Sequence, residues 1–216
     1  MLALYGHHFS SYTWKALIAL YANGTPFAFR PVDPDHPENG AAIATVSPLG
    51  KFPVLADGER MIFETTTIIE HLDRHHPGRE RLLPDDPDAA IAMRAIDRVF
   101  DHYVMNVMQI VVNEHIRDGA SPDQARCAEA RAQLTRAYSW IDDWLRTYSP
   151  RERVTLIECA AAPSLFYADW VHPIADDYPR LQAWRAHLLA LPPVKRCVDD
   201  ARPYRSFFPL GAPDRD

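Results

Sequence analysis

The sequence predicts an α/β N-terminal domain built on a small mixed sheet, followed by an all-helical C-terminal domain. Three observations predict this division. The first third of the chain alternates short apolar runs with helical patterns, Asp57-Gly58 between two apolar runs is a strong hairpin signal, and no convincing strand pattern occurs later. We expect residues 1–78 to form the first domain, 79–87 a linker and 88–216 the second domain.

The N-terminal elements follow from turn and capping signals. We expect strands at residues 2–5, 26–32, 52–56 and 60–63. The first helix begins at Ser10-Ser11, an N-cap pair, and stops at Asn23-Gly24. The polar stretch 33–46 is predicted to be a loop with at most a short helix. A second helix begins near Thr65 and ends at Pro77-Gly78. A parallel strand pair followed by an antiparallel hairpin gives a mixed four-stranded sheet.

Helical patterns continue through the rest of the chain. Asp86-Pro87 is an N-cap followed by a proline at the first helical position, and helical spacing then continues to Gly119. Further helices are expected from Ser121-Pro122, from a capping box at Thr155–Glu158 and from Tyr178-Pro179. Four tryptophans at helical spacings are expected in the core: Trp140, Trp144, Trp170 and Trp184.

Composition argues against several classes of function. The 216 residues carry a formal net charge of −6 and no run of Lys or Arg longer than two, which argues against binding to nucleic acid or anionic membranes. No apolar stretch reaches the roughly 18 residues of a membrane span, and the N-terminus lacks a signal-peptide pattern. Cys127, Cys159 and Cys197 are odd in number and lack CxxC spacing, which is typical of reduced thiols. We expect a cytoplasmic protein without nucleic-acid or membrane partners.

Three segments, in order along the chain, resemble those of a known family. They are Ser47–Leu55 (SPLGKFPVL), Phe63–Leu72 (FETTTIIEHL) and Thr155–Ala168 (TLIECAAAPSLFYA). Together with Ser10-Ser11 they resemble the cytosolic glutathione transferase superfamily, with its NPxGKVPVL strand, its ESxAIxxYL helix start and its SLADxxxAP core helix. The resemblance spans nearly the whole chain. It implies a thioredoxin-like N-terminal domain and a helical-bundle C-terminal domain.

The chemistry of this family requires glutathione as a thiolate, because the neutral thiol is a poor nucleophile. Lowering a thiol pKa from about 8.5 by about two units requires about 2.7 kcal/mol. A hydrogen bond to a charged group contributes about 1.5–3 kcal/mol, and a helix N-terminus adds ~0.3–1 kcal/mol. The resemblance implies such a catalytic hydroxyl at Ser10 or Ser11, although the residues alone are also consistent with plain N-capping. Tyr12 stands where the zeta (isomerase) class has cysteine, and Tyr5 is a second hydroxyl at the strand end.

The resemblance also implies a glutathione-binding site. In the family the bond equivalent to Phe52–Pro53 is cis, and the backbone of the residue before proline pairs with the cysteinyl part of glutathione. Glu64 would pair with the γ-glutamyl ammonium, and Thr65 at a helix N-terminus would hold the γ-glutamyl carboxylate. Lys51 would meet the glycyl carboxylate. From the residues alone, Glu64-Thr65 is also an ordinary helix start and Lys51 a solvated lysine.

Two further sets of residues have side chains suited to binding a second substrate or a metal ion. The pocket for the second substrate is expected to include His7, Phe9, Tyr103 and Asn106. His71 and His75 lie four apart on a helix, as metal-binding pairs do. Without an evident third ligand they are expected on a solvated face, and no metal is expected.

The resulting expectation is a homodimeric glutathione transferase, with glutathione as co-substrate and a small, apolar electrophile as its second partner. Two alternatives stay open: a glutathione-dependent isomerase or peroxidase, and a non-catalytic binding or interaction protein of the same fold. A thioredoxin-like disulfide oxidoreductase is disfavoured because no cysteine occurs in the first domain. The identity of the electrophile is not encoded in any motif, since apolar pockets discriminate poorly between substrates.

Overall fold

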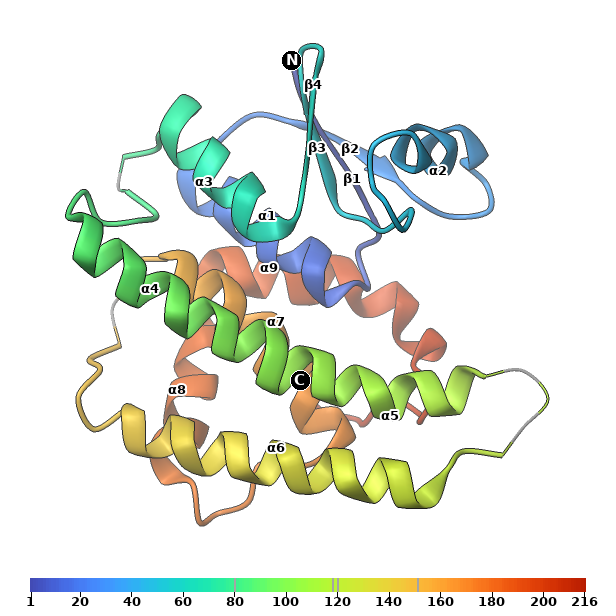
Figure 1. The fold of residues 1–216 in the computed structure, drawn as a ribbon, viewed down its shortest axis with the longest axis vertical. Helices are drawn as coiled ribbons and strands as arrows, with labels where there is room; N and C mark the ends of the chain where they lie inside the picture. Colours follow the sequence, from blue (N-terminus) through green and yellow to red (C-terminus); the bar gives the residue numbers. More distant parts are fainter. Residues whose placement is uncertain (80, 118, 120, 151) are drawn as a thin grey trace.

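The N-terminal part of the molecule is a four-stranded sheet with the strand order β2-β1-β3-β4 (Figure 1). The computed structural model describes residues 1–79, 81–117, 119, 121–150 and 152–216. The strands are β1 (Leu2–Gly6), β2 (Ala28–Pro31), β3 (Val54–Asp57) and β4 (Arg60–Phe63). β1 pairs in parallel with β2 and antiparallel with β3, which pairs antiparallel with β4. The predicted mixed sheet is confirmed.

Three helices accompany the sheet. α1 (Ser11–Asn23) and α3 (Thr65–His75) pack against each other, and α2 (Pro37–Ala44) lies on the other side of the strands (Figure 1). α1 begins where predicted because the Ser10 hydroxyl oxygen accepts the backbone N–H of Thr13. α2 lies within the predicted loop, which agrees with a short helix there.

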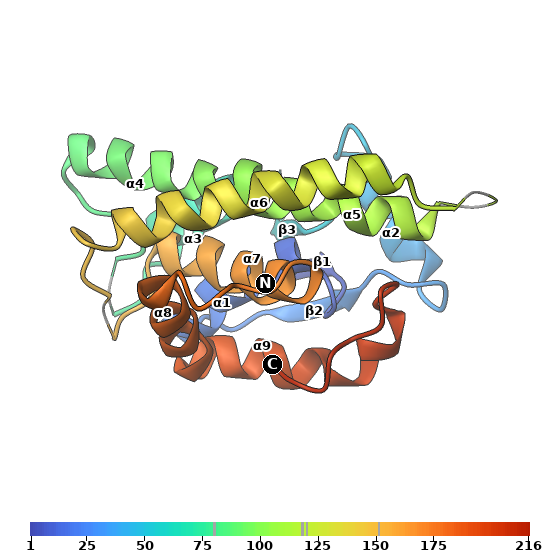
Figure 2. The same cartoon turned by 90° about the horizontal axis from the view of Figure 1, so that it is seen from below.

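The rest of the chain is helical. α4 (Pro87–Val99), a π-helix (Phe100–Met105) and α5 (Asn106–Ile116) follow one another without a break and form one long rod. α6 (Gln124–Trp144) packs against the π-helix and α5 of this rod (Figure 2). The remaining elements are α7 (Leu156–Val171), α8 (Pro179–Ala190), α9 (Pro192–Ala201) and a 3-10 helix (Arg202–Phe207).

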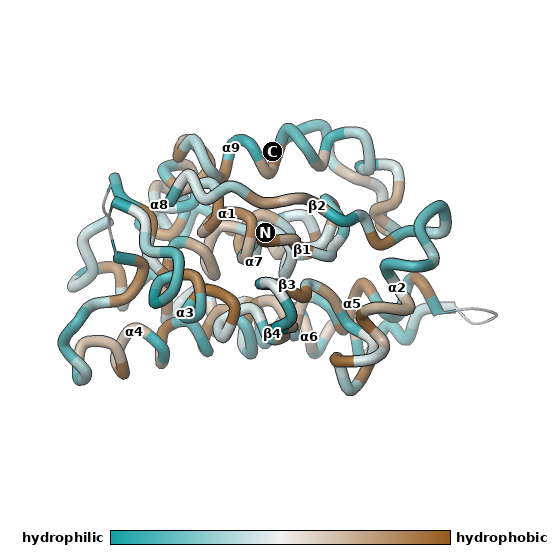
Figure 3. Tube along the Cα trace, turned by 90° about the horizontal axis from the view of Figure 1, so that it is seen from above, coloured by the Kyte–Doolittle hydropathy of each residue, from teal (hydrophilic) through white to brown (hydrophobic). Residues whose placement is uncertain are grey.

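The core of the molecule is continuous between its two parts. Every residue of α7 is buried, and α1 packs directly on both α7 and α9. The capping box of Thr155 and Glu158 is present at the start of α7, as predicted. α9 alternates between hydrophilic and hydrophobic residues in Figure 3, because only its apolar stripe is buried. Within the described chain, no helix is both long enough and apolar enough to cross a membrane.

Two expectations for the helical part need correction. α6 begins at Gln124 rather than at Ser121, because the Asp123 carboxylate accepts the backbone N–H of Arg126 at 3.1 Å and caps the helix there. Trp140 is not a core residue: it is 48% exposed on the outer face of α6, whereas Trp170 and Trp184 are buried. Helical spacing alone does not tell which face of a bundle helix is covered.

Candidate active site

A cavity of about 220 Å³ lies where the end of the α2–β3 loop, the start of α3 and the π-helix meet. All five residues predicted to bind glutathione line it, together with seven others. The lining residues are Tyr12, Ser47, Lys51, Phe52, Pro53, Phe63, Glu64, Thr65, Arg98, Asp101, His102 and Asn106.

The loop that enters β3 forms one wall of the cavity. The Phe52–Pro53 peptide bond is cis, as the family resemblance predicted. Just before it, the backbone N–H of Lys51 donates to the Ser47 hydroxyl at 2.9 Å, and Ser47 is itself buried. This bond fixes the backbone on which Lys51 and Phe52 are presented to the cavity.

The start of α3 forms a second wall. Glu64, immediately before the helix, has a φ of 66°, a value that favours glycine and costs a side-chain-bearing residue of order 1–3 kcal/mol. Within the described structure its side chain makes no capping hydrogen bond, so the first N–H groups of α3 are left to other acceptors. Thr65 is buried at the same helix end. A carboxylate and an anion-binding helix terminus therefore lie side by side.

The third wall comes from the helical part of the chain. Asp101, in the π-helix, is buried and accepts hydrogen bonds from Lys15 at 2.8 and 2.9 Å and from Arg98 at 2.5 Å. The Lys15 ammonium is fully buried and also pairs with Asp97 at 2.5 Å. Thr66 joins the network by donating to Asp97 at 2.8 Å. These contacts hold α1, α3 and the long rod in fixed positions around the cavity.

Arg98 and Asp101 were not identified from the sequence. The signal that could have found them is the run of charged residues Asp97, Arg98 and Asp101 inside an otherwise apolar helical pattern. Charged groups at such positions are buried only when they are paired. Lys15, the partner of Asp97 and Asp101, lies more than 80 positions away, so the pairing required the fold.

Tyr12 also lines the cavity. Its phenol donates to the Asn106 side-chain oxygen at 2.8 Å. Burial, assisted by the nearby Asp101 carboxylate, raises the pKa of Tyr12, so the phenol is protonated at physiological pH. From the sequence alone, Tyr12 is notable only because it stands where the zeta class has cysteine.

The two candidate catalytic serines lie at the N-terminus of α1, directly before Tyr12. The Ser10 hydroxyl accepts the Thr13 N–H at 3.3 Å, which leaves its own proton available for donation. Ser11 is buried at the first helical position. Neither serine is among the described residues that line the cavity.

The four residues expected in the second-substrate pocket are not brought together. Asn106 lines the cavity. His7 packs edge-on against Tyr204, with 4.7 Å between ring centroids, and Phe9 packs against Tyr167. Both therefore contact aromatic side chains of the C-terminal half, and neither is among the described residues that line the cavity.

Tyr103 lies apart from the other three. It is 61% exposed and lines a different cavity, of about 450 Å³, against α6. Residues three apart share one face of an α-helix, but the wider turn of the π-helix separates Tyr103 from Asn106.

The larger cavity has a different chemical character. Its lining residues are Val99, Tyr103, Val107, Gln133, Arg136, Ala137 and Trp140. Arg136 is the one formally charged side chain among these described residues. The smaller cavity instead carries charged side chains of both signs, Lys51, Arg98, Glu64 and Asp101.

Comparison with known families agrees with this geometry. Residues 4–80 match the family model of the glutathione S-transferase N-terminal domain, and residues 99–192 match that of the glutathione S-transferase C-terminal domain. Together the two models span most of the chain. The chain belongs to the glutathione transferase superfamily.

Individual members of the superfamily resemble this chain over most of their length. A probable maleylacetoacetate isomerase from Vibrio cholerae serotype O1 is 25% identical, over 94% of this chain and 97% of its own. Glutathione S-transferase PARB from Nicotiana tabacum is 24% identical, over 88% and 94%. Among solved structures, a glutathione S-transferase from Methylobacterium radiotolerans in complex with glutathione sulfonate is 26% identical. It has a TM-score of 0.74 and matches over 91% of this chain and 94% of its own.

Proposed function

We propose that this chain is a glutathione transferase that binds glutathione in the 220 Å³ cavity and presents its thiolate to a small electrophile. The observation that supports this most directly is the charge pattern beside the cis-proline. Glu64 offers a carboxylate to the γ-glutamyl ammonium, while the start of α3 at Thr65 and the Lys51 ammonium suit the two carboxylates of glutathione. Glutathione sulfonate bound to the related Methylobacterium radiotolerans enzyme supports the same ligand class.

The proposed reaction is nucleophilic attack by the glutathione sulfur. A hydroxyl at Ser10 or Ser11, at the N-terminus of α1, donates a hydrogen bond to the thiolate and so stabilises its charge. The thiol proton is released to solvent. The sulfur forms a bond to the electrophilic carbon, and the leaving group departs with its electron pair. In this step the serine acts as a hydrogen-bond donor and not as a base.

Calorimetric titration with glutathione tests the site. We expect micromolar to low-millimolar binding that weakens more than about tenfold in Glu64→Ala, since a charge-assisted contact to the γ-glutamyl ammonium is lost. Glu70→Ala is the matched control: Glu70 also lies on α3, but it pairs with Arg94 outside the cavity. Equal loss in both variants would contradict the site. Absence of binding in the unmodified chain would favour a non-catalytic interaction protein.

An isomerase is the second candidate. The Vibrio cholerae relative bears the name of an isomerase, and Ser10-Ser11 matches the first two residues of the zeta-class motif. Here the thiolate would add to a conjugated double bond and leave again after rotation. Turnover of a maleyl compound without consumption of glutathione would favour the isomerase, whereas consumption of glutathione with an activated aryl halide would favour the transferase.

We further propose a homodimer in the cytoplasm. Tyr103 and Trp140 are large side chains exposed beside the 450 Å³ cavity, which makes the outer face of the long rod and α6 suitable for a second copy. The three cysteines are free and buried, which suits a reducing compartment.

A further inference from the structure

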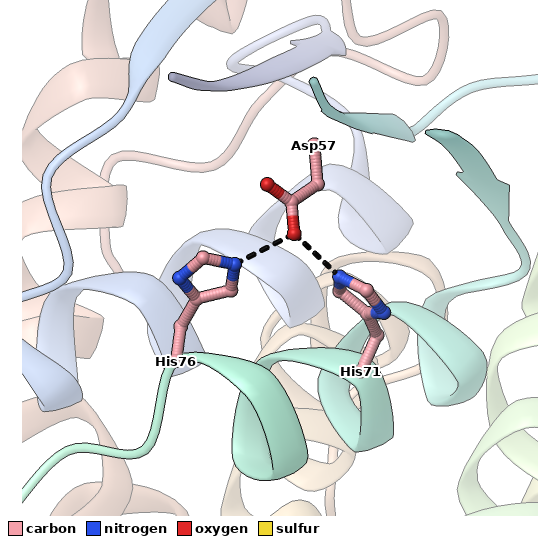
Figure 4. A group of neighbouring side chains, drawn as sticks. All are labelled: Asp57, His71 and His76. Carbon is pink, nitrogen blue, oxygen red and sulfur yellow. Dashed lines mark hydrogen bonds and ion pairs between the residues drawn. The ribbon is translucent and has the colours of Figure 1, made fainter. Parts of the chain in front are cut away.

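Three side chains with metal-binding atoms converge at the end of the sheet away from the cavity. Asp57 is the last residue of β3, His71 lies on α3, and His76 directly follows α3 (Figure 4). The Nε2 atoms of His71 and His76 lie 2.9 and 2.7 Å from the same Asp57 oxygen, Oδ2. The ligand atoms of all three residues lie within 4.8 Å of one another.

The local fold explains why these residues meet. The turn at Gly58, with a φ of 61°, ends β3 at Asp57, and α3 packs against β3 and β4. Residues five apart on an α-helix would point about 140° away from each other. The helix ends at His75, however, and His76 leaves it with φ −134° and ψ 51°, so both imidazoles face Asp57. The spacing of His71 and His75 in the sequence suggests a possible metal-binding pair, whereas in the structure His71 lies beside His76 and Asp57.

The donor set suits a zinc-type ion. Two imidazole nitrogens and one carboxylate oxygen are ligands that Zn²⁺ takes in proteins, at about 2.0–2.2 Å, which places ligand atoms about 3.3 Å apart around a tetrahedral ion. The distances from Asp57 Oδ2 to the Nε2 atoms of His76 and His71 are 2.7 and 2.9 Å. They need to increase only slightly for an ion to take the place of the protons in these two hydrogen bonds.

The surroundings decide which ions fit. Two cations lie nearby: Arg60, which is opposite Asp57 in the β3–β4 strand register, and Arg74 on α3. The His75 ring packs against the His71 ring at 4.5 Å between ring centroids. A single carboxylate near two cations is a poor site for Ca²⁺ or Mg²⁺, which require several oxygen ligands. Imidazole nitrogens instead favour Zn²⁺ and its neighbours in the transition series.

We propose that Asp57, His71 and His76 bind one zinc-type divalent ion, with water as the remaining ligand, and so clip the end of α3 to β3. Asp57 and His76 are 25% and 31% exposed, which gives water access to the site. His71 and His76 lie six and eleven residues after Thr65, so the clip lies about 9–16 Å along the helix from the Thr65 end of α3 in the cavity. The ion therefore acts on stability and takes no part in thiol chemistry.

The test is zinc titration of the full, tag-free chain after chelator treatment, in buffer without glutathione. We expect one ion to bind with micromolar affinity and to raise the thermal midpoint, because a ligand of the folded state stabilises it. Affinity should fall more than about tenfold in His71→Ala and His76→Ala. His75→Ala is the matched control and should bind as the unmodified chain does. Cys127, Cys159 and Cys197 are buried and do not compete.

Three results would overturn the proposal: no saturable zinc binding by the unmodified chain, unchanged affinity in both His71→Ala and His76→Ala, or equal loss in His75→Ala. Circular dichroism shows whether each variant is folded. If His71→Ala or His76→Ala does not fold, the zinc affinity of Asp57→Asn is measured in its place. Visible absorption bands of the Co²⁺-loaded protein should show four-coordinate geometry and be absent from Asp57→Asn. Glutathione affinity should stay unchanged in these variants, so this proposal and the proposed transferase function can fail separately.

Discussion

The phenol of Tyr12 donates a hydrogen bond of 2.8 Å to the side-chain oxygen of Asn106. The two residues are 94 positions apart, so this contact joins the first turn of α1 to the start of α5 at the cavity proposed to bind glutathione. A phenol has one proton to donate, and this bond uses it. We therefore expect a serine hydroxyl at the start of α1, rather than the Tyr12 phenol, to donate to a bound thiolate.

Substitutions at the start of α1 should distinguish the donors. We expect one of Ser10→Ala and Ser11→Ala to raise the thiol pKa of bound glutathione by about one to two units, because a charge-assisted hydrogen bond of about 1.5–3 kcal/mol is lost. Tyr12→Phe should leave this pKa nearly unchanged. Ultraviolet absorbance of the thiolate, measured against pH at saturating glutathione, gives the values. A raised pKa in Tyr12→Phe alone would assign the role to the tyrosine instead.

Lys15→Met should be strongly destabilising. It leaves Asp97 and Asp101 buried without their ammonium partner, and breaking a buried pair on one side costs about 3–5 kcal/mol. Urea unfolding measures the loss in free energy of unfolding. Arg94→Ala removes a partly exposed pair with Glu70 and should cost no more than about 1 kcal/mol. Similar losses in the two variants would show that the buried network contributes little.

The pH dependence of stability should involve His8, which stacks on Phe29 at 4.0 Å between ring centroids. Burial lowers the pKa of His8, with Asp200 opposing this in part. At a pH between the two pKa values, His8 is protonated in the unfolded chain and neutral in the folded chain. The free energy of unfolding therefore falls as the pH drops through the unfolded-state pKa of about 6.5. His8→Phe keeps the stack and removes the proton. Its free energy of unfolding should fall less between about pH 7.5 and 5.5, and parallel curves would contradict this.

The proposed dimer can be tested at Trp140. Trp140→Glu places a charge on the exposed face beside the 450 Å³ cavity and should produce a monomer, because burying an unpaired charge in an interface is costly. Trp140→Phe keeps the face apolar and should remain a dimer. Light scattering gives the masses. A dimer that persists in Trp140→Glu would place the interface elsewhere.

Local signals in the sequence were sufficient for much of the fold. The Asp57-Gly58 hairpin, the N-cap at Ser10 and the capping box at Thr155 each depend on neighbouring residues, and each is present. The cis bond before Pro53 was predicted from family resemblance, since no local rule requires it.

What the sequence did not yield depends on distant contacts or on helix geometry. Lys15 meets Asp101 only because α1 packs across the long rod. Tyr103 and Asn106 would share a face in a regular α-helix, and a π-turn has no composition that marks it reliably. The pairing of His71 with His76 likewise depends on where α3 ends, and helix ends are uncertain by one or two residues in any prediction.

The π-turn at Phe100–Met105 makes the length of this helix matter as much as its side chains. A π-turn holds one residue more than the α-helical turn it replaces, so removing that residue would let the rod continue as a regular α-helix with α5 kept in place. The side chains within Phe100–Met105 would then follow one another at about 100°, and those that face the cavity would meet it at different angles. A single-residue insertion or deletion at this point can thus change which side chains a ligand in the cavity meets while the sheet, the cis-proline loop and α3 keep their sequence.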